Sequence, residues 1–139
     1  MTKELALKTL ADIYEAFGVE EEAKADSALM PLLESDSLDF DNGSGFISYN
    51  LKAPLDLKND GTVNVVKFRE ATAGELEYIR KGMNVNRSLE TICTGDMVTM
   101  TLRVLVKTGG LATGLADRLK RRDITVLTPI LTELGFFYI

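Results

Sequence analysis

Residues 65–76, with the sequence VVKFREATAGEL, contain the end of one predicted strand and the start of one predicted helix. The valines continue the second strand of a hairpin. Thr72, followed three residues later by Glu75, matches the capping box, in which two side chains satisfy the first free backbone amides of a helix. The helix is expected to run through Ile79 and to stop near Gly82. A hairpin followed directly by a helix predicts an α+β fold that is otherwise mostly helical.

The hairpin itself is predicted over about residues 48–68. Residues 46–57 alternate between apolar and polar side chains, which is typical of a strand with one buried face. Asp60-Gly61 is a strong signal for a tight turn, and valines resume after it. Pro54 within the first strand indicates an edge position or a bulge.

The N-terminal part is predicted to be an acidic helical segment joined by a linker. Residues 3–17 carry apolar side chains at helical spacing, with Gly18 as a stop, and residues 28–33 favour a second short helix. Residues 34–45 are rich in Ser, Asp, Asn and Gly and favour a linker. We therefore divide the chain into residues 1–45 and a core of residues 46–139.

Charge follows the same division. The chain of 139 residues has a net charge of −5. Its first 45 residues contain three Lys and eleven Asp or Glu, which gives this part a net charge of −8. The remainder carries a net charge of +3. Either the two parts have different roles, or uneven helix faces in a small acidic protein account for the difference.

The C-terminal half contains one ambiguous element and two predicted helices. Residues 96–108 fit both a strand and a helix, although their β-branched content favours a strand. Residues 111–119 predict a short helix, and residues 124–137 a longer one that contains Pro129, which disfavours a straight helix.

Composition excludes several kinds of chemistry. The chain has no His and a single Cys, Cys93, so it lacks an imidazole base, an intramolecular disulfide and a cysteine-cluster zinc site. No apolar run approaches the roughly 20 residues of a membrane span. We expect no catalytic, cofactor-binding or metal-binding residue, no membrane association and no enzymatic activity.

Three polar clusters have a structural as well as a functional interpretation. The acidic residues at 36–41 lack the spacing of a calcium loop, and the glycines at 109–114 lack the Lys of a phosphate-binding loop. The basic residues at 118–122 are expected to lie in the last turn of a helix or to contact a protein, because no aromatic residue interleaves them as in many nucleic-acid sites.

Several sequence pieces then follow one another in a recognisable order. They are Leu51-Lys-Ala-Pro54, Phe68-Arg-Glu-Ala-Thr-Ala-Gly-Glu-Leu76, Thr108-Gly-Gly-Leu111, Leu115-Ala-Asp-Arg-Leu119 with Arg122-Asp123, and Gly135-Phe-Phe137. This arrangement resembles the tail assembly chaperones of contractile-tailed, Mu-like bacteriophages over about residues 47–137. The resemblance implies that residues 96–108 are helical.

The resemblance also implies a non-enzymatic protein of the host cytoplasm. Such a chaperone binds the long helical tape-measure protein and helps to recruit tail-tube subunits, and it can form homo-oligomers. We expect the partner to contact an apolar face flanked by two arginines. The candidate residues are Leu102, Leu105, Leu111, Leu115, Leu119, Arg121, Arg122, Phe136 and Phe137. The hairpin edge at residues 51–57 is an alternative surface for a second copy.

Two other functions compete with this one. The protein could be another structural or completion component of a phage tail. Alternatively, the basic residues at 118–122 could serve a small nucleic-acid-binding regulator, although the acidic balance of the chain disfavours nucleic acid.

Overall fold

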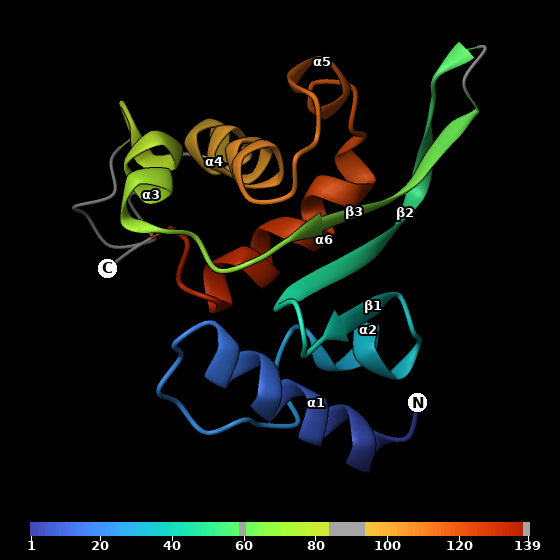
Figure 1. Ribbon diagram of the computed structural model, residues 1–139. Coiled ribbons are helices and arrows are strands. Elements are labelled where there is room, and N and C mark those ends of the chain that lie inside the picture. Colours follow the sequence, from blue (N-terminus) through green and yellow to red (C-terminus); the bar gives the residue numbers. More distant parts are fainter. Residues whose placement is uncertain (59–60, 84–93, 138–139) are drawn as a thin grey trace.

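Three antiparallel strands form the sheet in the computed structural model, which describes residues 1–58, 61–83 and 94–137 (Figure 1). The strands are β1 (Leu38–Asp41), β2 (Phe46–Asp56) and β3 (Thr62–Phe68), in the order β1-β2-β3. Tyr49 in the middle strand pairs with Leu38 on one side and with Val66 on the other. The predicted hairpin is confirmed, and Asp60 of its turn lies outside the described residues.

The linker predicted over residues 34–45 is wrong, because four of its residues form β1. Leu38 is buried and Phe40 is half-buried, whereas the aspartates between and after them are exposed. This alternation extends over only four residues, so the polar composition around it hides the strand in the sequence. The Asp41 carboxylate closes the following turn by accepting hydrogen bonds from the Gly43 amide and the Ser44 hydroxyl, at 3.0 and 2.8 Å.

Six helices complete the α+β fold in the described part of the chain. They are α1 (Lys3–Ala16), α2 (Met30–Glu34), α3 (Ala73–Arg80), α4 (Thr94–Lys107), α5 (Thr113–Ala116) and α6 (Arg121–Glu133). In Figure 1, α1 and α2 lie on the side of β1, whereas α3, α4 and α5 lie on the opposite side. α6 contacts both α4 and β2, and so links the helices to the sheet.

α4 confirms the helix implied by the resemblance, and the strand alternative for residues 96–108 is wrong. Met100, Val104 and Leu105 are fully buried along one side of this helix. Burial of a helical stripe outweighs the modest strand preference of the β-branched residues, which amounts to about 1 kcal/mol at most per residue.

The capping box at the start of α3 is present as predicted. The Thr72 hydroxyl accepts a hydrogen bond from the Glu75 amide at 3.3 Å, and the Glu75 carboxylate accepts one from the Thr72 amide at 2.9 Å. Arg69, directly after the preceding strand, donates two further hydrogen bonds to the same carboxylate, at 2.9 and 3.0 Å. The strand-to-helix junction is therefore held by side chains from both of its ends.

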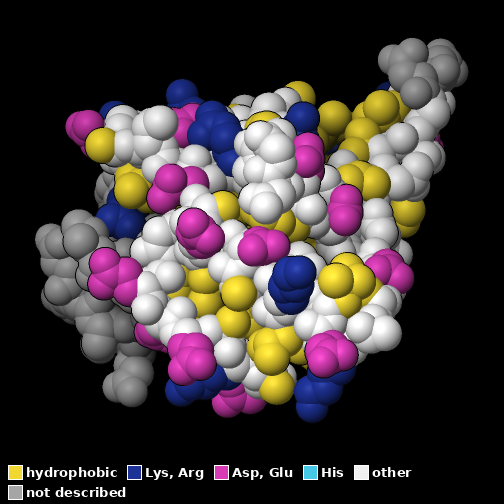
Figure 2. Space-filling view, turned by 60° about the horizontal axis from the view of Figure 1, so that its bottom comes forward, with side chains coloured by type: hydrophobic (Ala, Val, Ile, Leu, Met, Phe, Trp, Pro, Cys, Tyr) yellow, Lys and Arg dark blue, Asp and Glu magenta, His cyan; other side chains and the backbone are white. Residues whose placement is uncertain are grey.

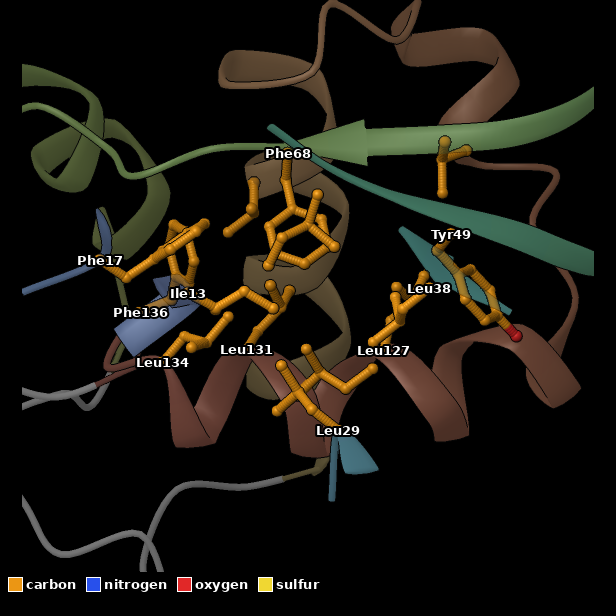
Figure 3. Packing of buried hydrophobic residues seen from close by; sticks show 14 of the residues in the cluster. Ile13, Phe17, Leu29, Leu38, Tyr49, Phe68, Leu127, Leu131, Leu134 and Phe136 are labelled. Carbon is orange, nitrogen blue, oxygen red and sulfur yellow. The ribbon is translucent and has the colours of Figure 1, made fainter. Parts of the chain in front are cut away.

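One hydrophobic core contains residues from the N-terminal segment and from the rest of the chain (Figure 3). Phe17 follows α1, Phe68 ends β3 and Phe136 follows α6, and their rings meet edge to face with centroids 6.1–6.2 Å apart. Ile13 and Leu131 are fully buried in the same cluster. The acidic N-terminal segment thus packs into the common core, whereas most of its acidic side chains are exposed. Figure 2 shows Asp and Glu side chains spread over one face of the molecule.

Candidate functional site

Three residues of the predicted apolar face belong to the core. Leu105 and Phe137 are fully buried and Phe136 is 3% exposed, so the structure places these three residues in the interior and not on an exposed face. Leu105 lies on the inner side of α4, and Phe136 packs against two other phenylalanines. The spacing of apolar residues shows that they form a stripe on a helix. It does not show whether another element of the fold already covers that stripe.

The other four predicted leucines are half-buried. Leu111, Leu115 and Leu119 pack against the edge of the core. Leu102 lines a hollow between α3, α4 and α5, together with Tyr78 and Val106. The predicted apolar residues are therefore divided between the interior, the edge of the core and one hollow.

The hollow beside Leu102 contains cations that already have structural partners. Arg103 donates hydrogen bonds to the carbonyls of Tyr78, Ile79 and Lys81 at 2.7–3.4 Å, where α3 ends. Its guanidinium also lies over the Tyr78 ring, as does the Lys107 ammonium at 4.5 Å from the ring centroid. These contacts join α3 to α4, so they account for the basic residues of this hollow without a ligand.

A second hollow, which we name the α4–α6 groove, is mainly apolar. Its lining residues are Met97, Val98, Arg121, Ile124, Thr125, Thr128 and Pro129. The hollow encloses about 420 Å³ and opens to solvent between the two helices. The hydroxyls of Thr101 and Thr128 lie 3.1 Å apart and connect α4 to α6 beside it.

Arg121 and Arg122 lie at the opposite end of a helix from the one predicted. They are the first two residues of α6, next to its N-cap Lys120, so the expectation that they occupy a last helical turn is wrong. Positive charge is unfavourable there, because the free amides of the first turn already carry partial positive charge. Both side chains are exposed, and within residues 1–58, 61–83 and 94–137 no ion pair involves either of them.

Arg118, in the same basic run, differs from these two arginines. Its guanidinium donates a hydrogen bond of 2.6 Å to the Asp56 carbonyl at the end of β2. This contact holds the segment before α6 against the hairpin, so Arg118 has a structural role.

Asp123 fixes the start of α6 and thereby one wall of the groove. Its carboxylate is fully buried and accepts hydrogen bonds from the Tyr49 hydroxyl at 2.9 Å and from the amides of Lys52 and Ala53 at 2.7 and 3.1 Å. Burial and the neighbouring carboxylate raise the pKa of Tyr49 above its ordinary value. The sequence alone does not predict this role of Asp123. The only signal was an acidic residue beside the predicted start of a helix.

The remaining candidates give no second site. Gly109 and Gly110 lie in the connection between α4 and α5, as predicted, whereas Gly114 lies within α5. Cys93 lies outside the described residues. No group of His, Cys, Asp or Glu suited to a metal ion occurs in the part of the chain that the structure describes. None of the described helices is long and apolar enough to cross a membrane.

Comparison of the chain with protein-family models, with curated proteins and with solved structures finds no match.

Proposed function

We propose that the protein is a tail assembly chaperone of a contractile-tailed bacteriophage, which acts in the host cytoplasm by binding and not by catalysis. Its partners would be the tape-measure protein and the tail-tube protein. The proposal rests on the order of the sequence pieces over residues 47–137, and one structural observation supports it.

That observation is that the sequence pieces contact one another across the fold. The amides of Lys52 and Ala53, in the hairpin piece, donate to Asp123 of the Arg122-Asp123 piece. The Arg69 amide of the junction donates to the Thr108 hydroxyl at 3.3 Å.

The ending of the chain is attached in the same way. Arg80, which follows the junction in α3, donates to the carbonyls of Gly135 and Phe136 at 3.3 and 3.1 Å. Residues that contact one another in this way form one structural unit. The joint occurrence of the sequence pieces therefore supports the proposed family more strongly than each short piece alone.

The binding activity has a physical basis in the exposed apolar surface. A long amphipathic helix in water exposes apolar side chains that promote aggregation, and a small protein with a complementary groove reduces that exposure. The α4–α6 groove is the most apolar of the hollows described above.

Co-expression with the tape-measure protein of the same phage tests the function. We expect the tape-measure protein to be largely insoluble alone and to become soluble, and to co-purify, when the full chain is present. Failure to form a complex at micromolar concentrations would contradict the proposal. Mass spectrometry of purified virions adds a second test, because an assembly chaperone is absent from them whereas a structural tail component is present.

A further inference from the structure

We propose that the α4–α6 groove binds one amphipathic helix of a different protein, and that acidic residues on the flank of this helix pair with Arg121 and Arg122. The inference deepens the proposed function, on which it rests for the source of the helix, namely the tape-measure protein. The site and the chemistry of its occupant are argued from the described residues alone.

The groove has the dimensions and the polarity that suit a helix. α6 lines the groove from Arg121 to Pro129, a stretch of roughly 12 Å at about 1.5 Å per residue. Met97 and Val98 line the groove from α4 and are half-buried, and Ile124 and Pro129 line it from α6. Helices bind such grooves through apolar residues three or four positions apart.

The charge at one end of the groove specifies an acidic partner. Arg121 lines the groove and Arg122 is its neighbour, and neither forms an ion pair within the described part of the chain. Two cations at the N-terminus of a helix are unfavourable, because the free amides of its first turn already carry partial positive charge. Such local conflicts concentrate at functional positions, and a carboxylate from a partner would remove this one.

Pro129 leaves one backbone carbonyl of α6 without its usual intrahelical partner. A proline has no amide hydrogen, so the Thr125 carbonyl lacks the hydrogen bond that residue 129 would otherwise donate within α6. Thr125 and Pro129 both line the groove and are exposed. A polar side chain of the bound helix can donate to this carbonyl, which would give the site a fixed register.

A second copy of the chain does not supply the required helix from its described residues. Its exposed large hydrophobic residues are Met1, Leu5, Val65 and Tyr78. The apolar stripe of α1 is buried, as Ala6, Leu10 and Ile13 are fully covered, and Leu5 is the one large hydrophobic residue of that helix that is exposed. The described residues of a second copy thus present no such helix, and we assign the occupant to another protein.

Binding of two synthetic peptides to the full chain tests the chemistry of the site. Both are fluorescein-labelled amphipathic helices with the same leucine face, one flanked by Glu and the other by Lys. Fluorescence anisotropy should give micromolar affinity for the Glu peptide and an affinity at least about tenfold weaker for the Lys peptide. Absence of binding of the Glu peptide up to about 100 µM, or equal binding of the two peptides, would overturn the proposal.

Two variants locate the peptide, each with a matched control. Val98→Asp places a charge in the groove and should weaken binding of the Glu peptide at least about tenfold, whereas Val65→Asp changes an exposed valine on β3 and should leave it unchanged. Arg121→Glu should reverse the preference between the peptides, whereas Lys8→Glu on the exposed side of α1 should not. Circular dichroism confirms that each variant folds. Equal effects of a variant and its control would contradict the site.

The same variants separate the site from the function. If the wild-type chain and Val98→Asp solubilise the tape-measure protein equally, the groove is not the site although the function holds. If the wild-type chain fails to solubilise it while the peptide results hold, the function is wrong and the groove binds another acidic helix. Stronger binding of a DNA duplex than of the Glu peptide, lost in Arg121→Glu, would assign the arginines to nucleic acid and overturn the inference.

Discussion

The Tyr49 hydroxyl donates a hydrogen bond of 2.9 Å to the Asp123 carboxylate, and both side chains are fully buried. This contact joins the middle strand of the sheet to the first turn of α6. The same carboxylate accepts the amides of Lys52 and Ala53, where the pairing of β2 with β3 is shifted between Asn50 and Leu55. Asp123 thus accepts hydrogen bonds from two backbone amides that lie where the pairing of β2 with β3 is interrupted.

Replacement of Asp123 by Asn should destabilise the protein by about 2–4 kcal/mol. The NH2 group of Asn would replace one of the two accepting oxygens, so in this buried site a donor would face another donor. Urea unfolding measures the loss. Tyr49→Phe removes only one hydrogen bond and should cost about 1 kcal/mol. A loss in Asp123→Asn no larger than that in Tyr49→Phe would show that the two backbone contacts contribute little.

Glu133 attaches the segment after α1 to the end of α6. Its carboxylate accepts hydrogen bonds from the hydroxyls of Tyr14 and Ser27 and from the Ala28 amide, at 2.8, 2.5 and 3.0 Å. Burial and the hydrogen bond to Glu133 raise the pKa of Tyr14 to about 12.

Replacement of Glu133 by Ala should loosen residues 19–29 and reduce stability by about 1–3 kcal/mol, because the three donors lose their acceptor. Hydrogen exchange should show faster exchange of the Ala28 amide. Glu15→Ala, which changes an exposed residue of α1, is the matched control and should leave this exchange rate unaltered. Unchanged exchange in Glu133→Ala would mean that the core packing of α1 alone holds the segment.

Stability should fall in acid because of Glu75. The hydrogen bonds from Arg69, followed by the one from the Thr72 backbone, lower the pKa of this carboxyl to about 2. Folding therefore favours the ionised form. Its contribution is complete above the ordinary pKa of about 4.3 and is lost as the pH falls toward 2.

Because the Glu75 side chain is 19% exposed and that of Arg69 is 34% exposed, we expect a contribution of about 1–2 kcal/mol after solvent screening. Denaturant unfolding between about pH 5 and pH 2.5 should show a smaller decrease in Glu75→Gln than in the wild-type chain. Equal slopes for the two proteins would assign the acid sensitivity to other carboxylates.

Short sequence patterns predict the helices and strands that are stabilised by residues close together in the chain. The Thr72–Glu75 capping box and the hairpin depend on residues close in the chain, so short patterns were sufficient. β1 was missed because its four residues are stabilised by pairing with β2 and by burial of Leu38, which are tertiary effects. The helical state of residues 96–108 likewise depends on packing, and residue preferences alone favoured a strand.

The candidate site was only partly predictable for the same reason. Arg121 was identified as a site residue, and the structure places it in the α4–α6 groove. The sequence pattern does not single out Met97 and Val98, which line the groove, and it includes Leu105 and Phe137, which are buried. A stripe of apolar residues is identical in a sequence whether it faces the core or a partner, so only the three-dimensional packing distinguishes the two.

Gly109 lies where the end of α4 meets β3, and this contact leaves no room for a side chain. A Cβ atom at this position would lie 1.9 Å from the Lys67 carbonyl oxygen and 2.8 Å from that of Leu105, both of them backbone atoms. Since backbone atoms cannot turn away as a flexible side chain can, Gly109→Ala should force α4 and β3 apart. It should also disturb the nearby hydrogen bond from the Arg69 amide to Thr108. We expect a loss of about 2–4 kcal/mol, measured by urea unfolding.

Gly114→Ala in α5 is the matched control, because a Cβ atom there meets nothing within 4 Å. Alanine suits a helix better than glycine, so this control should be neutral or stabilising by up to about 1 kcal/mol. A Gly109→Ala variant as stable as the control would show that the close approach of α4 to β3 is not required for the fold.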